Sequence, residues 1–336
     1  MGACTQQRIL VIRRDNIGDL VCTTPLLRAL RRQLPDARIE VLVTRYNRAV
    51  LDNNPDIDAV HSYIKAKHRE ADESVVSIYW ERLRMLLGLR RNRFDVAIIA
   101  GGHSASAMRF AHWVRPRRVV VLDEDAAAPG PHEVEKCCHL LTSLGHAYET
   151  PAPRVVARED AVAALRGQLG IAAGTPVLAI HISARKPSQR WPAERFAQLM
   201  RRLHATSSLS HFMLLWAPGS ESNPMHPGDD EKAEVVLNMT KDLPIHPVPT
   251  QRLEDLIAAL GACDRLICAD GGAMHLGAGL GKPILCFFGQ SDAERWHPWG
   301  VPYELLQPES RDVADISVED ALAAFNRLAA RDMTIA

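Results

Sequence analysis

Short apolar runs alternate with longer stretches of helical periodicity from the start of the chain. Runs of strand length occupy residues 8–13, 39–44 and 94–100, and their continuous apolar character is typical of strands buried on both faces. Between the first two runs, leucines recur at helical spacing at Leu26, Leu27, Leu30 and Leu34. The pattern predicts a strand–helix–strand unit whose helix begins within residues 19–24, with a proline in its first turn, where proline is tolerated.

The same rhythm continues to the end of the chain. Further strands are expected at residues 59–63, 119–122, 177–182, 212–216, 266–268 and 284–288. Further helices are expected at residues 49–53, 76–90, 104–114, 133–144, 159–169, 193–204, 231–239, 253–261, 273–280 and 318–330. A proline-containing stretch at 150–154 interrupts the alternation and reads as a domain boundary. We therefore predict an α/β protein with two Rossmann-like, doubly wound domains that face a cleft.

One stretch of the second half, residues 266–289, has the order strand, glycine turn, helix, strand. Asp270, Gly271 and Gly272 separate the first strand from the helix, and His275 lies one turn into that helix. The open amides and the dipole of such a helix start form an anion site, which glycines let a phosphate approach closely. On this interpretation Asp270 braces the turn or bonds a ribose hydroxyl. The structural alternative makes Asp270 only a helix cap and His275 only a surface histidine.

Composition narrows the class of protein. The 336 residues carry no formal net charge, which argues against a strongly basic nucleic-acid binder. No run of eighteen apolar residues occurs, the first residues lack the layout of a signal peptide, and the seven cysteines show no C-x-x-C spacing. We expect a cytoplasmic protein with no resident metal, and an association with a membrane surface stays open.

The loops exclude two common nucleotide chemistries. A hydride-transfer enzyme would carry G-x-G-x-x-G after its first strand, whereas the first loop here holds only Gly18. The glycines at 277–281 follow a helix and precede a strand, which is the reverse of the context that a dinucleotide-binding glycine motif requires. Lys282 is not followed by serine or threonine, as a phosphate-binding P-loop would require.

Asp19 is the candidate catalytic residue of the first domain. It lies beyond the first strand, at the sheet edge where the carboxyl ends of parallel strands gather ligands. In the functional interpretation it is a general base facing an acceptor hydroxyl. In the structural interpretation it caps a helix.

The second domain offers cations and carboxylates near the predicted anion site. Lys186 and Arg190 follow a strand in a loop that also holds Ser183, and either one suits a cationic clamp on a departing diphosphate. The alternative is a solvated basic loop. Asp229 and Asp230 are either helix-start carboxylates favoured by the dipole or contacts for a sugar or ribose. Residues with a weaker case as donor or sugar contacts are Gly18 and Gln251.

Three motifs in order resemble the ADP-heptose:lipopolysaccharide heptosyltransferases, glycosyltransferase family 9. The first is I-L-V-I-R-R-D-N-I-G-D-L-V-C-T-T-P-L-L-R-A-L, which is similar to that family's N-terminal signature. The second is H-I-S-A-R-K-P-S-Q-R-W-P-A-E-R-F, and the third is C-A-D-G-G-A-M-H-L-G-A-G-L-G-K-P-I-L-C-F-F-G. Together they span nearly the whole chain.

The resemblance implies a GT-B fold with an acceptor-binding domain at residues 1–155, a donor-binding domain at 156–316, and a terminal helix and tail at 317–336 that return to the first domain. It implies an inverting transfer of heptose or a related sugar from an ADP-sugar to the lipopolysaccharide inner core or a related glycan. No cofactor is required, and Mg²⁺ is not implied. In the family, the residue matching Asp19 is the proposed base. The positions matching Ser183, Asp270, Gly271, Gly272 and His275 contact the phosphates or ribose of the donor.

Two departures from the family pattern bear on the donor. Members often carry a lysine two positions before the Trp191–Pro192 pair, where this chain has Gln189, so either Lys186 or Arg190 takes over the clamp. The loop at 217–230 is also longer than in well-known members, which bears on the sugar or nucleotide accepted.

Two other functions are compatible with the sequence. One is a nucleotide-sugar epimerase of GT-B-like fold, which needs no acceptor, and another is a non-catalytic nucleotide-binding protein. Basic residues of the first half suit an acidic glycolipid or a peripheral contact with the inner face of the bacterial cytoplasmic membrane, or equally solvated helix faces. They are Arg28, Arg31, Arg32, Arg45, Arg48, Lys65, Lys67, Arg82, Arg84, Arg90, Arg91 and Arg93.

Overall fold

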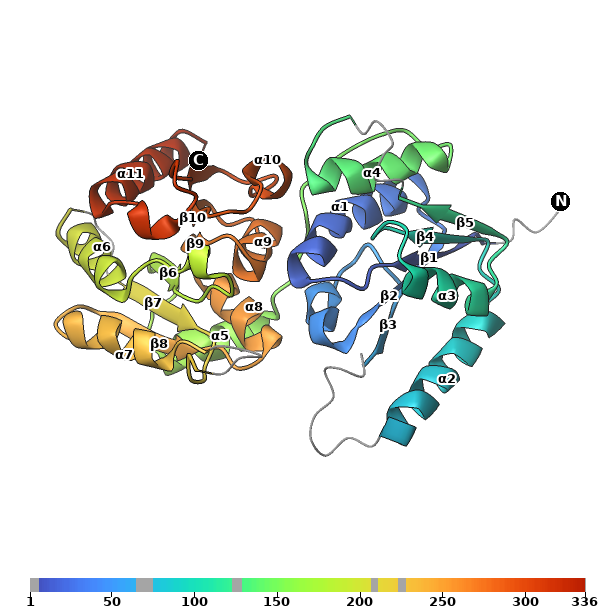
Figure 1. Cartoon of the computed structure of the whole chain (residues 1–336), viewed down its shortest axis with the longest axis horizontal. Coiled ribbons are helices and arrows are strands. Elements are labelled where there is room, and N and C mark those ends of the chain that lie inside the picture. Colours follow the sequence, from blue (N-terminus) through green and yellow to red (C-terminus); the bar gives the residue numbers. More distant parts are fainter. Residues whose placement is uncertain (1–5, 65–74, 123–128, 207–210, 223–227, 336) are drawn as a thin grey trace. The chain divides into compact units, whose positions relative to one another are not determined.

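The computed structural model describes residues 6–64, 75–122, 129–206, 211–222 and 228–335 (Figure 1). The expected features at residues 65–74, which include Lys65 and Lys67, lie outside the described residues. By its contacts the chain divides into two compact units, Met1–Val155 and Val156–Ala336. Each unit is a parallel sheet with helices on both faces, so the predicted α/β, doubly wound class is confirmed.

Unit 1 contains a five-stranded sheet in the order β3-β2-β1-β4-β5. Its strands are β1 (Arg8–Ile12), β2 (Arg38–Thr44), β3 (Ala59–Tyr63), β4 (Val96–Ile99) and β5 (Arg118–Val121). The helices α2 (Val75–Arg91) and α3 (Ala105–Val114) pack together on one face, over Leu10, Ile12 and Ile99. The other face carries the paired helices α1 (Ile17–Gln33) and α4 (Glu133–Ser143) (Figure 1).

Helix α1 begins earlier than the periodicity predicted. It starts at Ile17, because Asn16 and Asp19 form a capping box that satisfies the first amides. Pro25 therefore lies inside the helix rather than in its first turn. A proline there leaves the carbonyl one turn earlier without its helical donor. Here the Thr24 hydroxyl donates to the Val21 carbonyl at 2.7 Å and takes over that role. The predicted helix at 49–53 is instead a 3-10 helix, η1 (Arg45–Leu51).

Unit 2 contains a six-stranded sheet in the order β11-β10-β9-β6-β7-β8. Its strands are β6 (Val177–His181), β7 (His211–Trp216), β8 (Ile245–Pro249), β9 (Arg265–Ala269), β10 (Ile284–Phe287) and β11 (Tyr303–Leu306). Strands β7 and β8 follow on one side of β6, and β9, β10 and β11 follow on the other side, which is the strand order of dinucleotide-binding folds. In such folds, ligands lie beyond the carboxyl ends of the strands, at the point where the strand order reverses. That switch point lies between β6 and β9.

The helices of unit 2 form two groups. The group over Trp191 and Phe196 comprises α6 (Ala193–Thr206), α7 (Asp230–Met239) and α11 (Val318–Ile335). The other group comprises α5 (Glu159–Gln168), α8 (Leu253–Ala262) and α9 (Gly272–Gly279). The short α10 (Ala293–Trp296) follows β10, and the single-turn helices η3 (Pro187–Gln189) and η4 (Val313–Asp315) lie in loops.

The terminal helix completes one layer of unit 2. Helix α11 packs against α6, β10 and β11. Its buried residues Ala321, Phe325 and Leu328 belong to the same core as the β6 and β7 side chains. The physical reason is that this face of the sheet would otherwise expose apolar surface.

Candidate active site

In unit 1, Arg13 organises the charged residues at the carboxyl end of β1. Its side chain is 3% exposed, and its Nη2 lies 2.7 Å from Asp19 Oδ1 and 2.8 Å from Glu133 Oε1. Its Nε lies 3.1 Å from Asp15 Oδ2. Glu133 comes from the first turn of α4 and is buried, whereas Asp15 is 42% exposed. One buried guanidinium thus orients Asp19 and Glu133 by hydrogen bonds and lies within ion-pair distance of the more exposed Asp15.

Asp19 is held from both sides. Its second oxygen accepts hydrogen bonds from the Asn16 backbone amide at 3.1 Å and side-chain amide at 3.0 Å. Burial alone would raise the pKa of Asp19, but the charge and hydrogen bond of Arg13 and the Asn16 donors outweigh it, and the pKa lies below its usual range. Asp19 remains 15% exposed. It is therefore an ionised carboxylate of fixed orientation with an accessible edge, and it is also the capping-box residue of α1.

In unit 2, the glycine turn follows β9 as the sequence predicted. Gly271 has φ +156°, a conformation that side-chain-bearing residues rarely adopt. The backbone then enters α9 at Gly272, and no side chain in the described part of the chain caps the start of this helix. The first amides of α9 therefore remain available to an anion. His275 is buried one turn into α9, with its ring 5.9 Å from that of Trp296 in an edge-to-face arrangement.

A chain of polar contacts runs from the loop after β6 to the glycine turn. Gln189 Nε2 donates to Asp270 Oδ2 at 2.6 Å and to Ser291 Oγ at 2.8 Å. The Lys186 ammonium donates to the same Ser291 hydroxyl at 3.2 Å. The loop reaches this point because Gly289 leaves room for it: a Cβ there would lie 2.2 Å from the Ser188 carbonyl oxygen. Lys186 is thus connected through Ser291 and Gln189 to Asp270, which directly precedes the glycine turn.

Arg190 has different partners. Its Nη2 contacts Asp229 Oδ1 at 2.6 Å and Glu221 Oε1 at 2.9 Å, and its Nη1 donates to the Ala184 carbonyl at 3.1 Å. Asp229 is almost fully buried, and burial raises its pKa even though Ser183, Arg190 and Lys232 stabilise its charge. Arg190 therefore forms an ion pair with the buried Asp229, next to Ser183. These partners differ from the residues that surround Asp270.

Lys232 lies in the same cluster as Arg190. Its ammonium donates to the Ile182 carbonyl at 2.9 Å, and burial lowers its pKa to about 8. The neighbouring His181 is buried in β6, and burial lowers its pKa to about 4, so it is neutral at pH 7. The positive charge of this cluster is carried by Arg190 and Lys232, and the negative charge by the buried Asp229 and the exposed Glu221.

The remaining sequence candidates have less suitable positions. Asp230 accepts from the Trp216 indole at 2.7 Å and from the Gly219 amide at 2.9 Å, which fixes the loop after β7. Gln251 is exposed before α8, and Gly18 is buried in the first turn of α1. Ser183 accepts from the Ala217 amide at 2.9 Å. These contacts make Asp230 a loop brace.

Sequence reasoning missed four residues that the structure brings into these clusters: Arg13, Glu133, Lys232 and Ser291. Arg13 carried a signal, since a charged residue directly after a buried strand lies at the ligand-binding edge of a parallel sheet. The others meet their partners across long chain separations, such as 120 residues between Arg13 and Glu133. Local spacing carries no information on such contacts.

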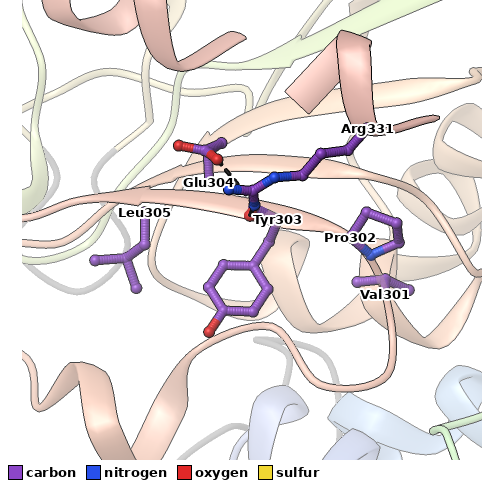
Figure 2. A pocket seen from close by; sticks show the side chains of 6 residues that line it. All are labelled: Val301, Pro302, Tyr303, Glu304, Leu305 and Arg331. Atoms are coloured by element: carbon purple, nitrogen blue, oxygen red, sulfur yellow. Dashed lines mark hydrogen bonds and ion pairs between the residues drawn. The ribbon is translucent and has the colours of Figure 1, made fainter. Parts of the chain in front are cut away.

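A surface pocket of about 520 Å³ lies away from these groups, along β11. Figure 2 shows Arg331 of α11 reaching Glu304 of β11, with Tyr303, Leu305 and two further residues around them. Glu304 pairs with Arg331 and with Arg327, both at 2.9 Å. None of the predicted site residues lines this pocket, so it contributes nothing to the candidate site. Within the described residues there is no group of three His, Cys, Asp or Glu arranged to hold a metal ion, and no helix long and apolar enough to cross a membrane.

Comparison with known families and with curated proteins gives consistent findings. The profile of the family described as glycosyltransferase family 9 (heptosyltransferase) matches residues 82–323. Among curated proteins, the lipopolysaccharide heptosyltransferase 3 of Escherichia coli is 24% identical, over 93% of this chain and 96% of that protein.

Solved structures show the same fold. The Escherichia coli ADP-heptose lipopolysaccharide heptosyltransferase II superposes with a TM-score of 0.75 and 19% identity, covering 97% of this chain and all of that one. The Escherichia coli heptosyltransferase WaaC, solved with ADP, superposes with a TM-score of 0.77 and 16% identity, covering 96% of this chain and 100% of that one.

Proposed function

Because the chain belongs to glycosyltransferase family 9, the heptosyltransferases, and is therefore a glycosyltransferase, we propose that it moves a heptose or related sugar from an ADP-sugar to an inner-core lipopolysaccharide or related glycan, with inversion at the anomeric carbon. The observation that carries the donor half is the chain of hydrogen bonds that connects Lys186, through Ser291 and Gln189, to Asp270 before the open start of α9. Relatives named for ADP-heptose and solved with ADP support the choice of nucleotide.

The leaving diphosphate is the group that needs stabilisation. As the bond between the anomeric carbon and the diphosphate oxygen breaks, negative charge develops on that oxygen. The amides of Gly271 and Gly272, the dipole of α9 and the Lys186 ammonium supply positive potential there. Gln189 occupies the position of the family's usual lysine and, being neutral, adds no charge, so Lys186 supplies the cation. His275 adds a donor one turn into the helix.

Asp19 carries the acceptor half of the proposal. The acceptor hydroxyl attacks the anomeric carbon from the face opposite the diphosphate, and its proton passes to the Asp19 carboxylate as the new glycosidic bond forms. An ionised, accessible carboxylate is required, and Arg13 and Asn16 keep Asp19 in that state.

Asp19→Asn should lower turnover by at least about a thousandfold, the upper range of general-base effects, while donor affinity stays within about twofold. The assay follows ADP release in the presence of acceptor. The control is Asn16→Ala, which removes the side-chain donor of Asn16 and so costs stability of about 1 kcal/mol, but keeps the carboxylate, its Arg13 partner and the backbone amide of residue 16. Near-normal turnover in Asp19→Asn would return Asp19 to a capping role.

Lys186→Ala should weaken ADP binding by at least about tenfold, since one charge-assisted hydrogen bond is lost. The measurement is calorimetry with ADP, UDP, GDP and CDP, in which ADP is expected to bind best. Arg185 is the matched control, because it is the adjacent exposed cation, and Arg185→Ala should bind ADP within about twofold of the unaltered protein. Equal losses in both variants, or no nucleotide binding by folded protein, would contradict the donor assignment.

A further inference from the structure

Helix α2 presents an apolar stripe to solvent. Its members are Val76 (78% exposed), Tyr79 (56%), Trp80 (59%), Leu83 (38%) and Leu87 (46%). With 3.6 residues per turn, these five positions fall within an arc of about 100°. Scattered surface hydrophobics need no explanation, but an aligned set of large apolar side chains on one helix face marks an interaction surface.

The stripe is not the face that packs α2 onto its own unit. Ile78 and Leu89 are buried on the opposite side of the helix, and Met85 and Leu86 pack against the core beneath α2 and α3. Helix α2 is therefore apolar on two sides, one of which already has its partner within unit 1. The neighbouring helix α3 adds an exposed Trp113 (51%) and Met108 (37%).

Positive charge surrounds the stripe. Arg84, Arg90 and Arg91 are exposed on α2 itself, whose one acidic residue, Glu81, pairs with Arg45 at 3.5 Å. Residues 75–119 contain nine arginines and two carboxylates, an excess of seven positive charges, whereas the whole chain has no formal net charge. Positive charge is thus concentrated in the segment of the chain that exposes the apolar stripe, and three of its arginines lie on α2 itself.

We propose that the α2 stripe docks on an anionic lipid bilayer. Tyrosine and tryptophan favour the boundary between headgroups and acyl chains, and leucine favours the acyl side. Arginines beside such a face attract anionic headgroups while their aliphatic stems lie along the apolar region. A second copy of the chain fits less well, because two surfaces with this excess of positive charge would repel each other. For the proposed transferase, docking would bring the protein to a lipid-borne acceptor, a consequence that rests on the proposed function.

Vesicle sedimentation of the full chain tests this proposal without donor or acceptor, so its result is independent of the transferase assignment. The purified protein should sediment with vesicles of phosphatidylglycerol and phosphatidylethanolamine, less with phosphatidylcholine alone, and less as salt is raised. Combining Trp80→Ser, Leu83→Ser and Leu87→Ser should lower the partition coefficient at least about tenfold, because three exposed apolar groups no longer enter the bilayer.

Two further variants complete the experiment. Arg84→Gln, Arg90→Gln and Arg91→Gln together should weaken binding to the anionic vesicles and flatten its salt dependence. The matched control replaces exposed apolar residues on α7 of unit 2, Val235→Ser with Met239→Ser, and should bind as the unaltered protein does. Thermal unfolding verifies that each variant is folded.

Three results would overturn the proposal. The first is failure of the unaltered protein to bind anionic vesicles. The second is a stripe variant that is folded and binds normally. The third is a dimer in solution that the stripe variant dissociates, which would make the stripe an interface between copies.

Discussion

At the scale of single residues, Arg13 determines what Asp19 can do. A buried guanidinium shared by Asp19, Asp15 and Glu133 keeps Asp19 ionised, and it fixes the direction in which the carboxylate points. The lowered pKa of Asp19 also means that its ionised form stabilises the fold at neutral pH. That contribution to stability is lost as the pH falls through the folded-state pKa of Asp19, which lies below the usual range of aspartate.

Arg13→Gln should therefore shift the acidic limb of the pH–rate profile to higher pH, because burial would then raise the pKa of Asp19 without the opposing charge. It should also cost about 3–5 kcal/mol of stability, since Glu133 would be left buried without its cation. The measurements are the pH–rate profile and urea unfolding. Adding Glu133→Gln to Arg13→Gln should restore much of the stability but not the acidic limb. If the acidic limb of the pH–rate profile stays in place in the folded double variant, Arg13 does not control the ionisation of Asp19.

Which side chains meet at a site was only partly predictable. Asp19, Asp270 and His275 were visible because each follows a strand–turn–helix pattern that local spacing reveals. The partner of Asp270 was not, because Gln189 lies 81 residues away along the chain. The choice between Lys186 and Arg190 likewise depended on contacts with Ser291 and Asp229, which only the folded chain supplies.

At the scale of elements, α1 shows how a helix accommodates an internal proline. The Thr24 hydroxyl replaces the missing donor to the Val21 carbonyl and also accepts from the Arg154 amide at 2.9 Å. It thereby ties α1 to the segment that ends unit 1. The helix remains continuous behind the Asp19 turn, which keeps the site in position.

Thr24→Val should destabilise the protein by about 2 kcal/mol, because a buried carbonyl and a partly buried amide lose their partner. In a Pro25→Ala background the same change should cost about 1 kcal/mol less, since the new amide can bond the Val21 carbonyl. Urea unfolding of the unaltered protein, the two single variants and the double variant measures the coupling free energy between Thr24 and Pro25. Thr142→Val is the control, because the exposed Thr142 hydroxyl makes a similar local bond to the His139 carbonyl. Additive effects at Thr24 and Pro25 would contradict this explanation.

Two strands were absent from the sequence interpretation for a physical reason. The β8 segment contains Pro247 and Pro249, and proline cannot donate to a strand ladder. The structure accommodates it because β8 pairs only with β7, at the edge of the sheet. The four-residue β11 is the other edge, and its Glu304 interrupts the apolar pattern in order to pair with Arg327 and Arg331. In the sheet of unit 2 the central strands were found by their apolar runs, and its two edge strands lacked that signal.

At the scale of the whole molecule, each unit carries one half of the proposed chemistry. Unit 1 holds an ionised carboxylate fixed by Arg13, together with the arginine-rich surface of α2 and α3. Unit 2 holds the open start of α9, and Lys186 is connected through Ser291 and Gln189 to Asp270, which precedes it. The family resemblance predicted from three sequence motifs is confirmed by the profile match.

The most direct test of the central claim is the anomeric configuration of the product. The protein is incubated with ADP-heptose and a lipopolysaccharide core that lacks the heptose, while ADP release and the anomeric proton are followed by NMR. The account predicts ADP release only when acceptor is present, one heptosyl unit added per ADP, and a configuration opposite to that of the donor. Retained configuration, or conversion of the donor without acceptor, would contradict inverting transfer.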